Sequence, residues 1–299
     1  MYKIVPHFWF DHQAEEAAQF YTSIFQHSKI VKIVHYGKEG FEIHGQQEGT
    51  VMTVDFELEE LPFIALNGGP HYVLNPSISF TVNCKEEEEV NRLWNSLSGG
   101  GQVLMPLDKY PFNEKYGWLS DKYGVSWQLI LNPEAEAKII PSMLFVGEQC
   151  GRAEDAIRFY TSVFSDSAVG TLFPYGSEQQ ENQPEHLAHG TFTLADQPFI
   201  AMDSGLKHGF AFSEAISFLV YCENQQEVDY FWEKLSADLS AEQCGWLKDK
   251  FGVSWQIVPK VLYKLMEDPN PVKAGRVMEA ILKMKKLDIQ KLQEAYEGK

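Results

Sequence analysis

Apolar and polar residues follow one another along the chain with two different periods, one near two residues and one near four. Residues 77–84 alternate strictly, which predicts a strand with one buried face. In residues 14–25 and 86–97 the apolar side chains recur every three or four positions, which predicts amphipathic helices. Further strands are predicted at residues 6–10, 29–35, 50–57, 63–67, 102–107, 117–119 and 125–131. The first half is therefore predicted to run β-α-β-β-β twice, with helices on one face of a sheet and a cup on the other.

The second half of the chain repeats the first. The block GWLSDKYGVSWQ at residues 117–128 recurs as GWLKDKFGVSWQ at residues 245–256, and FYTS, PFIA and ISF recur in the same order. The offset between the copies is 136–139 residues for the shorter blocks but 128 for the longest one. The second copy is thus about ten residues shorter before Gly245, which predicts that one of its strands is shortened or lost. Asp121 and Gly124 predict a tight turn inside the block.

The repeat divides the chain into two domains, residues 1–132 and 139–262, joined by a linker that contains Pro133. A tail of different character follows at residues 263–299. The DPNP segment at residues 268–271 interrupts it, and helices are predicted at residues 272–284 and 288–296. The apolar stripe of this tail predicts docking either on its own chain, which we expect, or on a partner chain.

The motifs resemble those of a known family. FY near the end of the first helix, FIALNGG at residues 63–69, and the repeated GWL block resemble the PhnB-like branch of the vicinal-oxygen-chelate superfamily, which includes glyoxalase, bleomycin-resistance proteins and extradiol dioxygenases. Members of this branch also carry the label 3-demethylubiquinone-9 3-methyltransferase domain. The resemblance covers both halves and residues 273–289 of the tail. It implies an α+β fold of tandem glyoxalase-like domains, each built of paired βαβββ modules that form an open, barrel-like sheet around a cavity.

In the metal-dependent members of the superfamily, His and Glu ligands come from the first and last strands of the modules. Carried over by strand position, these places fall near Pro6, Ala65, Ser77 and Gln128 in the first domain and near Pro141, Ala201, Ala215 and Gln256 in the second. Neither set contains a His or a carboxylate, so we predict no metal. His7 is expected on the helix side or the rim. No glycine-rich turn between a strand and a helix was identified for S-adenosylmethionine, and we predict no cofactor.

Alternation predicts which side chains face the cup. They are Phe8, Phe10, Asn67, Ser77, Ser79 and Gln128 in the first domain, and Phe145, Asp203, Ser217 and Gln256 in the second. This mixture of apolar and neutral hydrogen-bonding groups is typical of a site for a small organic ligand. Asp203 is the one candidate catalytic residue, a general base, because it replaces Asn67; the alternative is a turn residue in the sequence Asp203-Ser204-Gly205.

Charge and composition limit the classes of partner and the cellular location that we expect. The net charge of −17 argues against nucleic acid, because phosphates attract basic surfaces. No apolar run approaches the ~20 residues that span a bilayer, and the N-terminus lacks the apolar core of a secretion signal. The cysteines show no CxxC spacing, which indicates neither a zinc site nor a disulfide framework and fits a reduced cytoplasm.

Together these observations predict metal-free binding of a small organic molecule. One alternative is an enzyme of the superfamily: a lyase, a dioxygenase or the methyltransferase of the label. Another is a structural or interaction role without a ligand. Single-domain relatives commonly dimerise, and fusion supplies that interface within one chain. We therefore expect a monomer with an internal pseudo-dimer, with a homodimer as the alternative.

Overall fold

The structure is a computed structural model that describes residues 2–176 and 181–299. The first copy folds into two modules of the predicted order, with one extra short helix, α2. The first module comprises β1 (Ile4–Phe10), α1 (Ala14–Ile24), β2 (Lys29–His35), α2 (Phe41–His44), β3 (Val51–Leu58) and β4 (Leu61–Asn67). The second comprises β5 (Ile78–Cys84), α3 (Glu87–Ser98), β6 (Gln102–Tyr110), β7 (Asn113–Ser120) and β8 (Ser126–Leu131).

The second copy repeats both modules but is shortened in the second. Its first module comprises β9 (Ile139–Val146), the 3-10 turn η1 (Gly147–Gln149), α4 (Ala153–Val163), β10 (Ala168–Pro174), β11 (Leu187–Leu194) and β12 (Gln197–Ser204). Its second comprises β13 (Ile216–Cys222), α5 (Gln225–Leu235), β14 (Trp246–Lys248) and β15 (Ser254–Pro259). Residues 236–245, all of them described, contain no counterpart of β6, and β14 has 3 residues where β7 has 8.

The strands form two open sheets, and each sheet joins a module of one copy to a module of the other. Sheet A has the order β14-β15-β13-β1-β4-β3-β2, and sheet B has the order β10-β11-β12-β9-β5-β8-β7-β6. At the two joins β1 runs antiparallel to β13, and β5 runs antiparallel to β9. The α+β class and the open sheets are as predicted. The pairing differs from the expectation that each copy builds its own sheet, because periodicity identifies a strand but not its neighbour.

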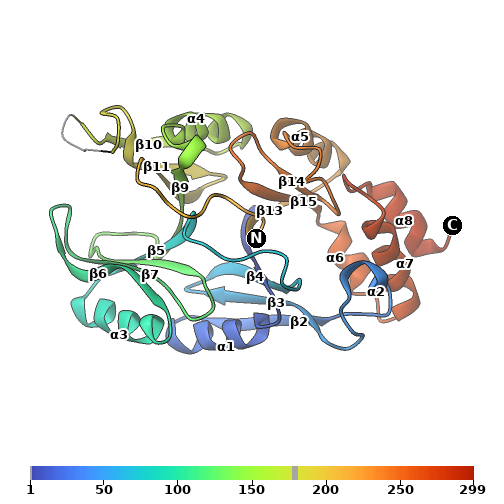
Figure 1. Cartoon of the computed structure of the whole chain (residues 1–299). Helices are drawn as coiled ribbons and strands as arrows, with labels where there is room; N and C mark the ends of the chain where they lie inside the picture. The colour runs from blue at the N-terminus through green and yellow to red at the C-terminus, as the bar shows by residue number, and fades with distance from the viewer. Residues whose placement is uncertain (1, 177–180) are drawn as a thin grey trace.

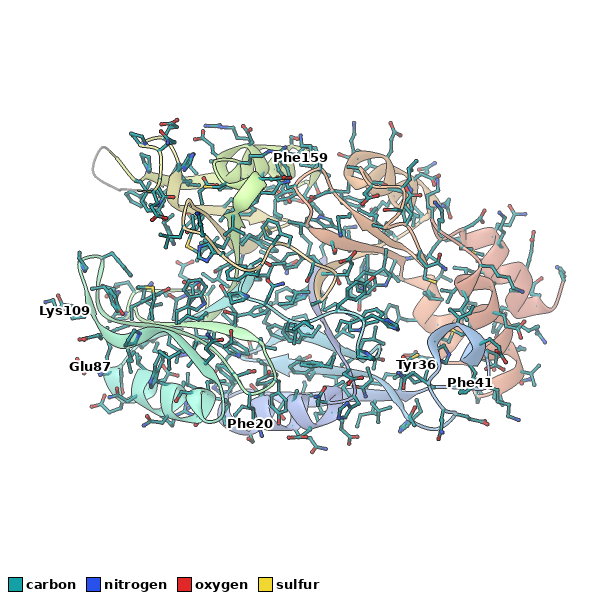
Figure 2. All side chains as sticks on the ribbon, in the orientation of Figure 1. Phe20, Tyr36, Phe41, Glu87, Lys109 and Phe159 are labelled. Carbon is teal, nitrogen blue, oxygen red and sulfur yellow. The ribbon has the colours of Figure 1, made fainter. Side chains whose placement is uncertain are left out.

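The buried apolar residues of both copies form one continuous core under the four helices, and the two modules of a copy meet within it. Helices α1 and α3 lie along one side of the molecule and α4 and α5 along the other, with the strands between them (Figure 1). Tyr21 of α1 packs on Trp127 of β8, which belongs to the other sheet, with ring centroids 5.4 Å apart. Phe20 on α1 and its counterpart Phe159 on α4 lie on opposite outer sides (Figure 2). Packing under the helices thus joins the two modules of one copy, and strand pairing joins the two copies.

The tail docks on its own chain. It forms α6 (Val261–Met266), α7 (Pro271–Leu282) and α8 (Ile289–Glu297), which lie at one end of the molecule beside β14 (Figure 1). The amides of Cys244 and Gly245, just before β14, donate to the carbonyls of Met284 and Lys285 at 2.8 and 2.7 Å. An apolar cluster that includes Leu287 and Leu292 buries the contact. No helix of the described chain is both long and apolar enough to cross a membrane.

Candidate functional site

The face of each sheet turned away from α1, α3, α4 and α5, called the concave face below, carries a buried row of polar side chains at its centre. On sheet A the row is His7, Ser217 and Ser254, from the adjacent strands β1, β13 and β15. The equivalent row on sheet B is Ser142, Ser79 and Ser126. The two rows differ in one place, where sheet A has an imidazole and sheet B a hydroxyl.

The row on sheet B is hydrogen-bonded within the protein. Ser142 shares a bond with the hydroxyl of Thr81 at 2.8 Å, and Gln128 Nε2 donates to Ser79 Oγ at 2.8 Å. Two aromatic residues of β7 complete the network. Tyr116 donates its hydroxyl to Gln128 Oε1 at 2.7 Å, and Trp118 Nε1 donates to Ser126 Oγ at 2.8 Å. The buried polar groups of this face are therefore stabilised by one another.

The row on sheet A is left incomplete. Gln256 Nε2 donates to Ser217 Oγ at 3.0 Å, as Gln128 does to Ser79. However, His7 Nδ1 and Ser254 Oγ are buried without a hydrogen-bond partner among residues 2–176 and 181–299. His7 is 4% and Ser254 is 1% exposed. These two atoms are unusual because buried polar groups nearly always have a hydrogen-bond partner.

One substitution and one change in the placement of an indole between the copies explain the unpaired atoms. Leu219 replaces Thr81, so the hydroxyl that would pair with the side chain on β1 is missing. Trp246, the counterpart of Trp118, stands edge-on to the His7 ring, with centroids 5.6 Å apart and the planes at 89°. Ser254 consequently receives no bond from the indole.

Aromatic side chains cover one side of the incomplete row. Trp9 on β1 meets Trp246 at 5.9 Å and Tyr72, from the β4–β5 connection, at 5.0 Å between ring centroids. The Trp9 indole lies about 2.1 Å from the position of a Cβ at Gly68, so only glycine fits there. At the rim, Lys248 pairs with Glu214 at 2.8 Å.

The tail helix α6 covers the other side of the row. Leu262 and Tyr263 pack against a cluster of concave residues, Val5, Ile64, Leu219, Tyr221 and Val258. Along β1, Val5 therefore meets the tail, His7 lies in the polar row, and Trp9 joins the aromatic cover. Burial lowers the pKa of His7 to about 3, so its imidazole is neutral near pH 7.

The structure keeps the predicted polar residues of each cup together on one sheet but places the predicted aromatic residues elsewhere. Ser217 and Gln256 lie on the concave face of sheet A, while Ser77, Ser79 and Gln128 lie on that of sheet B. Phe8, Phe10 and Phe145 belong instead to the core under the helices. Their predicted orientation was wrong because β1 and β9 are apolar on both faces, so alternation gives no contrast. His7, expected on the helix side or rim, faces the concave side. The difference between His7 on β1 and Ser142 at the equivalent position of β9 was the sequence signal that could have singled out this residue.

Asn67 and Asp203 lie at strand ends, and their side chains bond to the backbone at the start of the preceding helix and at the adjacent strand. Asn67 Oδ1 accepts from the Ala14 amide at 2.8 Å. Asp203 Oδ1 accepts from the amides of Gly151 and Ala153 at 2.7 and 3.2 Å, and its Oδ2 accepts from Leu187 at 2.9 Å. Asp203 is 1% exposed, and burial raises its pKa. These contacts describe a buried anchor at the start of α4, on the helix side of the sheet.

The side chains present do not fit a divalent metal. On the central strands β1, β4, β13 and β15 of sheet A, His7 is the one imidazole or carboxylate on the concave face. A single imidazole does not hold such an ion, which needs three or more protein ligands. In the described part of the chain, no three His, Cys, Asp or Glu side chains are grouped to hold a metal ion.

Comparison with known proteins assigns the fold to a family. The family described as 3-demethylubiquinone-9 3-methyltransferase matches residues 2–130 and again residues 137–258. The chain belongs to this family. It therefore carries two PhnB-like domains of the vicinal-oxygen-chelate superfamily, as the motifs predicted.

Two solved structures show how this tandem PhnB-like chain relates to others. A PhnB protein of Bacillus cereus is 41% identical and covers 44% of this chain and 100% of its own, with a TM-score of 0.40. Glyoxalase I of Zea mays is 10% identical and covers 89% of this chain and 95% of its own, with a TM-score of 0.54. No curated protein sequence matches significantly. The maize enzyme shares the tandem fold, and a shared fold does not transfer an activity.

Proposed function

We propose that this chain binds a small, uncharged organic molecule, without a metal, on the concave face of sheet A. His7 and Ser254 supply the hydrogen bonds, and Trp9 and Trp246 supply apolar contact. Ser217 and Gln256, which were predicted to face the ligand, are part of this proposed site. Ser79 and Gln128 are not, because these two side chains bond to each other and Tyr116 donates to the remaining oxygen of Gln128. Ser77 precedes β5 and is not part of the proposed site.

The observation that carries this proposal is the pair of buried, unpartnered atoms, His7 Nδ1 and Ser254 Oγ. A buried polar group without a partner costs about 1–3 kcal/mol. A ligand that bonds to both atoms recovers that free energy on binding. The same fold satisfies the equivalent groups on sheet B, so the deficit is particular to sheet A.

The chemistry of the row suggests the class of ligand. A neutral His7 can donate or accept one hydrogen bond, and a serine hydroxyl can do either. Lys248 on β14 is already paired with Glu214, so it offers no free charge for an anion. Indole faces favour a flat ring. We therefore expect an uncharged ring that bears a hydroxyl or amide group.

Thermal-shift titration with uncharged aromatic alcohols and amides, followed by crystal soaking of the hits, tests the proposal. Hits are expected to stabilise the wild type and Ser126→Ala but to lose their effect in Ser254→Ala and His7→Phe. Soaked crystals are expected to show the compound beside His7. Hits that stabilise Ser254→Ala and His7→Phe as well as wild type would contradict the site, and one tightly held divalent ion per domain in metal analysis would contradict metal-free binding.

We also propose that the chain acts as a monomer. Both joins between modules, β1 with β13 and β5 with β9, are made within one chain. Light scattering over a dilution series is expected to give the mass of one chain, and a concentration-dependent doubling would favour a homodimer.

A further inference from the structure

Cys150 and His186 lie side by side, away from the polar rows of the two sheets. Cys150 Sγ is 3.5 Å from His186 Nδ1. Cys150 comes from the connection between β9 and α4, and His186 directly precedes β11. Both side chains are half-buried, so solvent reaches them. A thiol in contact with an imidazole is the arrangement in which the nitrogen can take the thiol proton as the sulfur attacks.

Asp203 holds the two residues together. Its Oδ1 accepts from the amide of Gly151, which directly follows Cys150, at 2.7 Å. Its Oδ2 accepts from the amide of Leu187, which directly follows His186, at 2.9 Å. One buried carboxylate therefore fixes both segments, and Asp203 is a positioning residue for the pair.

The hydrogen bonds of His186 leave Nδ1 as the basic nitrogen. The Gln183 amide donates to Nδ1 at 3.2 Å, which requires a lone pair there. Burial and the charge of Asp203 raise the pKa of the Cys150 thiol, while the amides of Ser204 and Gly151 act in the opposite direction. The resting sulfur is thus a thiol beside a nitrogen whose lone pair also accepts from the Gln183 amide.

The fold itself does not require this pair. The β1–α1 connection has three residues, 11–13, whereas the β9–α4 connection spans residues 147–152 and contains Cys150. Thr50 takes the place of His186 in the first copy, and Asn67 takes that of Asp203. Asn67 Nδ2 donates to the Val51 carbonyl, where Asp203 accepts from the Leu187 amide. The first copy folds without a thiol, an imidazole or a carboxylate at these places.

We propose that Cys150 is a nucleophile, with His186 as its base, that adds to small uncharged activated alkenes. The sulfur bonds to the β-carbon of the alkene, and the π electrons move to the α-carbon. The thiol proton passes to His186 Nδ1, whose contact with Gln183 opens, and then to the α-carbon. Nothing is oxidised or reduced, and no group leaves. The site is independent of the row on sheet A.

N-ethylmaleimide labelling of the full chain, followed over time by peptide mass mapping, tests this proposal. Cys84 and Cys222 are both 0% exposed and should stay unlabelled. Cys244 is half-buried and contacts the Gln243 amide rather than an imidazole, so it is the internal comparator. Cys150 is expected to react at least about tenfold faster than Cys244, since a positioned base accelerates such steps by 10² or more.

His186→Gln is expected to lower the labelling rate of Cys150 at least about tenfold and to leave the labelling rate of Cys244 unchanged. Asp203→Asn, which copies the first domain, is expected to slow Cys150 in the same way. Protection of Cys84 and Cys222 reports that each variant is folded. Equal rates for Cys150 and Cys244 in the wild type, or an unchanged Cys150 rate in a folded His186→Gln, would overturn the proposal.

Discussion

The Tyr21 hydroxyl donates to Asp121 Oδ2 at 2.7 Å, across 100 residues of sequence. This bond joins α1 of the first module to the turn between β7 and β8 of the second. Tyr160 repeats it on Asp249 at 2.7 Å in the second copy. Asp121 is 4% exposed and also accepts from the Trp127 indole at 2.8 Å and from the amides of Tyr123 and Val125. The repeated GWL block is therefore explained by a buried carboxylate that ties two modules together.

Loss of either tyrosine hydroxyl is expected to weaken the fold. Tyr21→Phe and Tyr160→Phe each remove one donor from a buried carboxylate, which should lower the free energy of unfolding by about 1–3 kcal/mol. Urea unfolding followed by circular dichroism measures this. The exposed Tyr2 gives the control, because Tyr2→Phe should stay within about 0.5 kcal/mol of wild type. A Tyr21→Phe variant as stable as that control would contradict the prediction.

The two equivalent serines are expected to respond differently to truncation. Ser126→Ala leaves the Trp118 indole without its acceptor and should cost about 1 kcal/mol. Ser254→Ala removes a hydroxyl that has no partner among the described residues, so its effect should be within about 0.5 kcal/mol or stabilising. Unfolding measured in parallel without ligand gives the comparison. Equal losses in the two variants would show that Ser254 is bonded in the free protein.

His7 should make the fold sensitive to acid. Its pKa is lowered to about 3 by burial, against about 6.5 in an unfolded chain. Between these values the unfolded chain binds a proton that the folded chain does not, so stability falls as the pH drops below about 6.5. The loss at pH 5 is about 2 kcal/mol. His7→Phe should lack this loss, so its stability relative to wild type should rise by that amount between pH 7.5 and 5. A difference in stability between His7→Phe and wild type that is the same at both pH values would contradict this prediction.

Sequence periodicity predicted the elements wherever the two faces of a strand differ. Residues 77–84 alternate between polar and apolar, and the structure places Ser79 on the concave face and Phe80 in the core. On β1 the side chains of Phe8 and Trp9 are both large and apolar, so the same reasoning gave the wrong face. The orientation of a strand that is covered on both sides depends on tertiary packing.

The candidate sites depend on contacts between distant segments, which the sequence does not display. His7 and Ser254 share a row only because β13 lies between β1 and β15. Cys150 and His186 meet only because Asp203 binds the amides beside both. Asp203 itself was singled out by its difference from Asn67, but its bonds to the amides of Gly151, Ala153 and Leu187 could not be predicted from the sequence.

The tail is expected to detach when its packing is weakened. Leu292 is 0% exposed in the cluster formed by α6, α7, α8 and the segment just before β14. Leu292→Ala should cost about 2–5 kcal/mol locally and release residues 260–299 to limited trypsin digestion. The exposed Leu239 provides a matched control, since Leu239→Ala should leave the digestion pattern unchanged. Equal resistance of Leu292→Ala and wild type would contradict tight docking.

The pairing of β1 with β13 and of β5 with β9 means that neither copy forms a complete sheet by itself. A chain cut within residues 132–138 would leave bare hydrogen-bonding edges at the centre of both sheets. The two pieces should reassociate one to one when co-expressed, since each holds the missing neighbour of the other. The linker then serves as a tether, and it keeps the local concentration of one half near the other in the millimolar range.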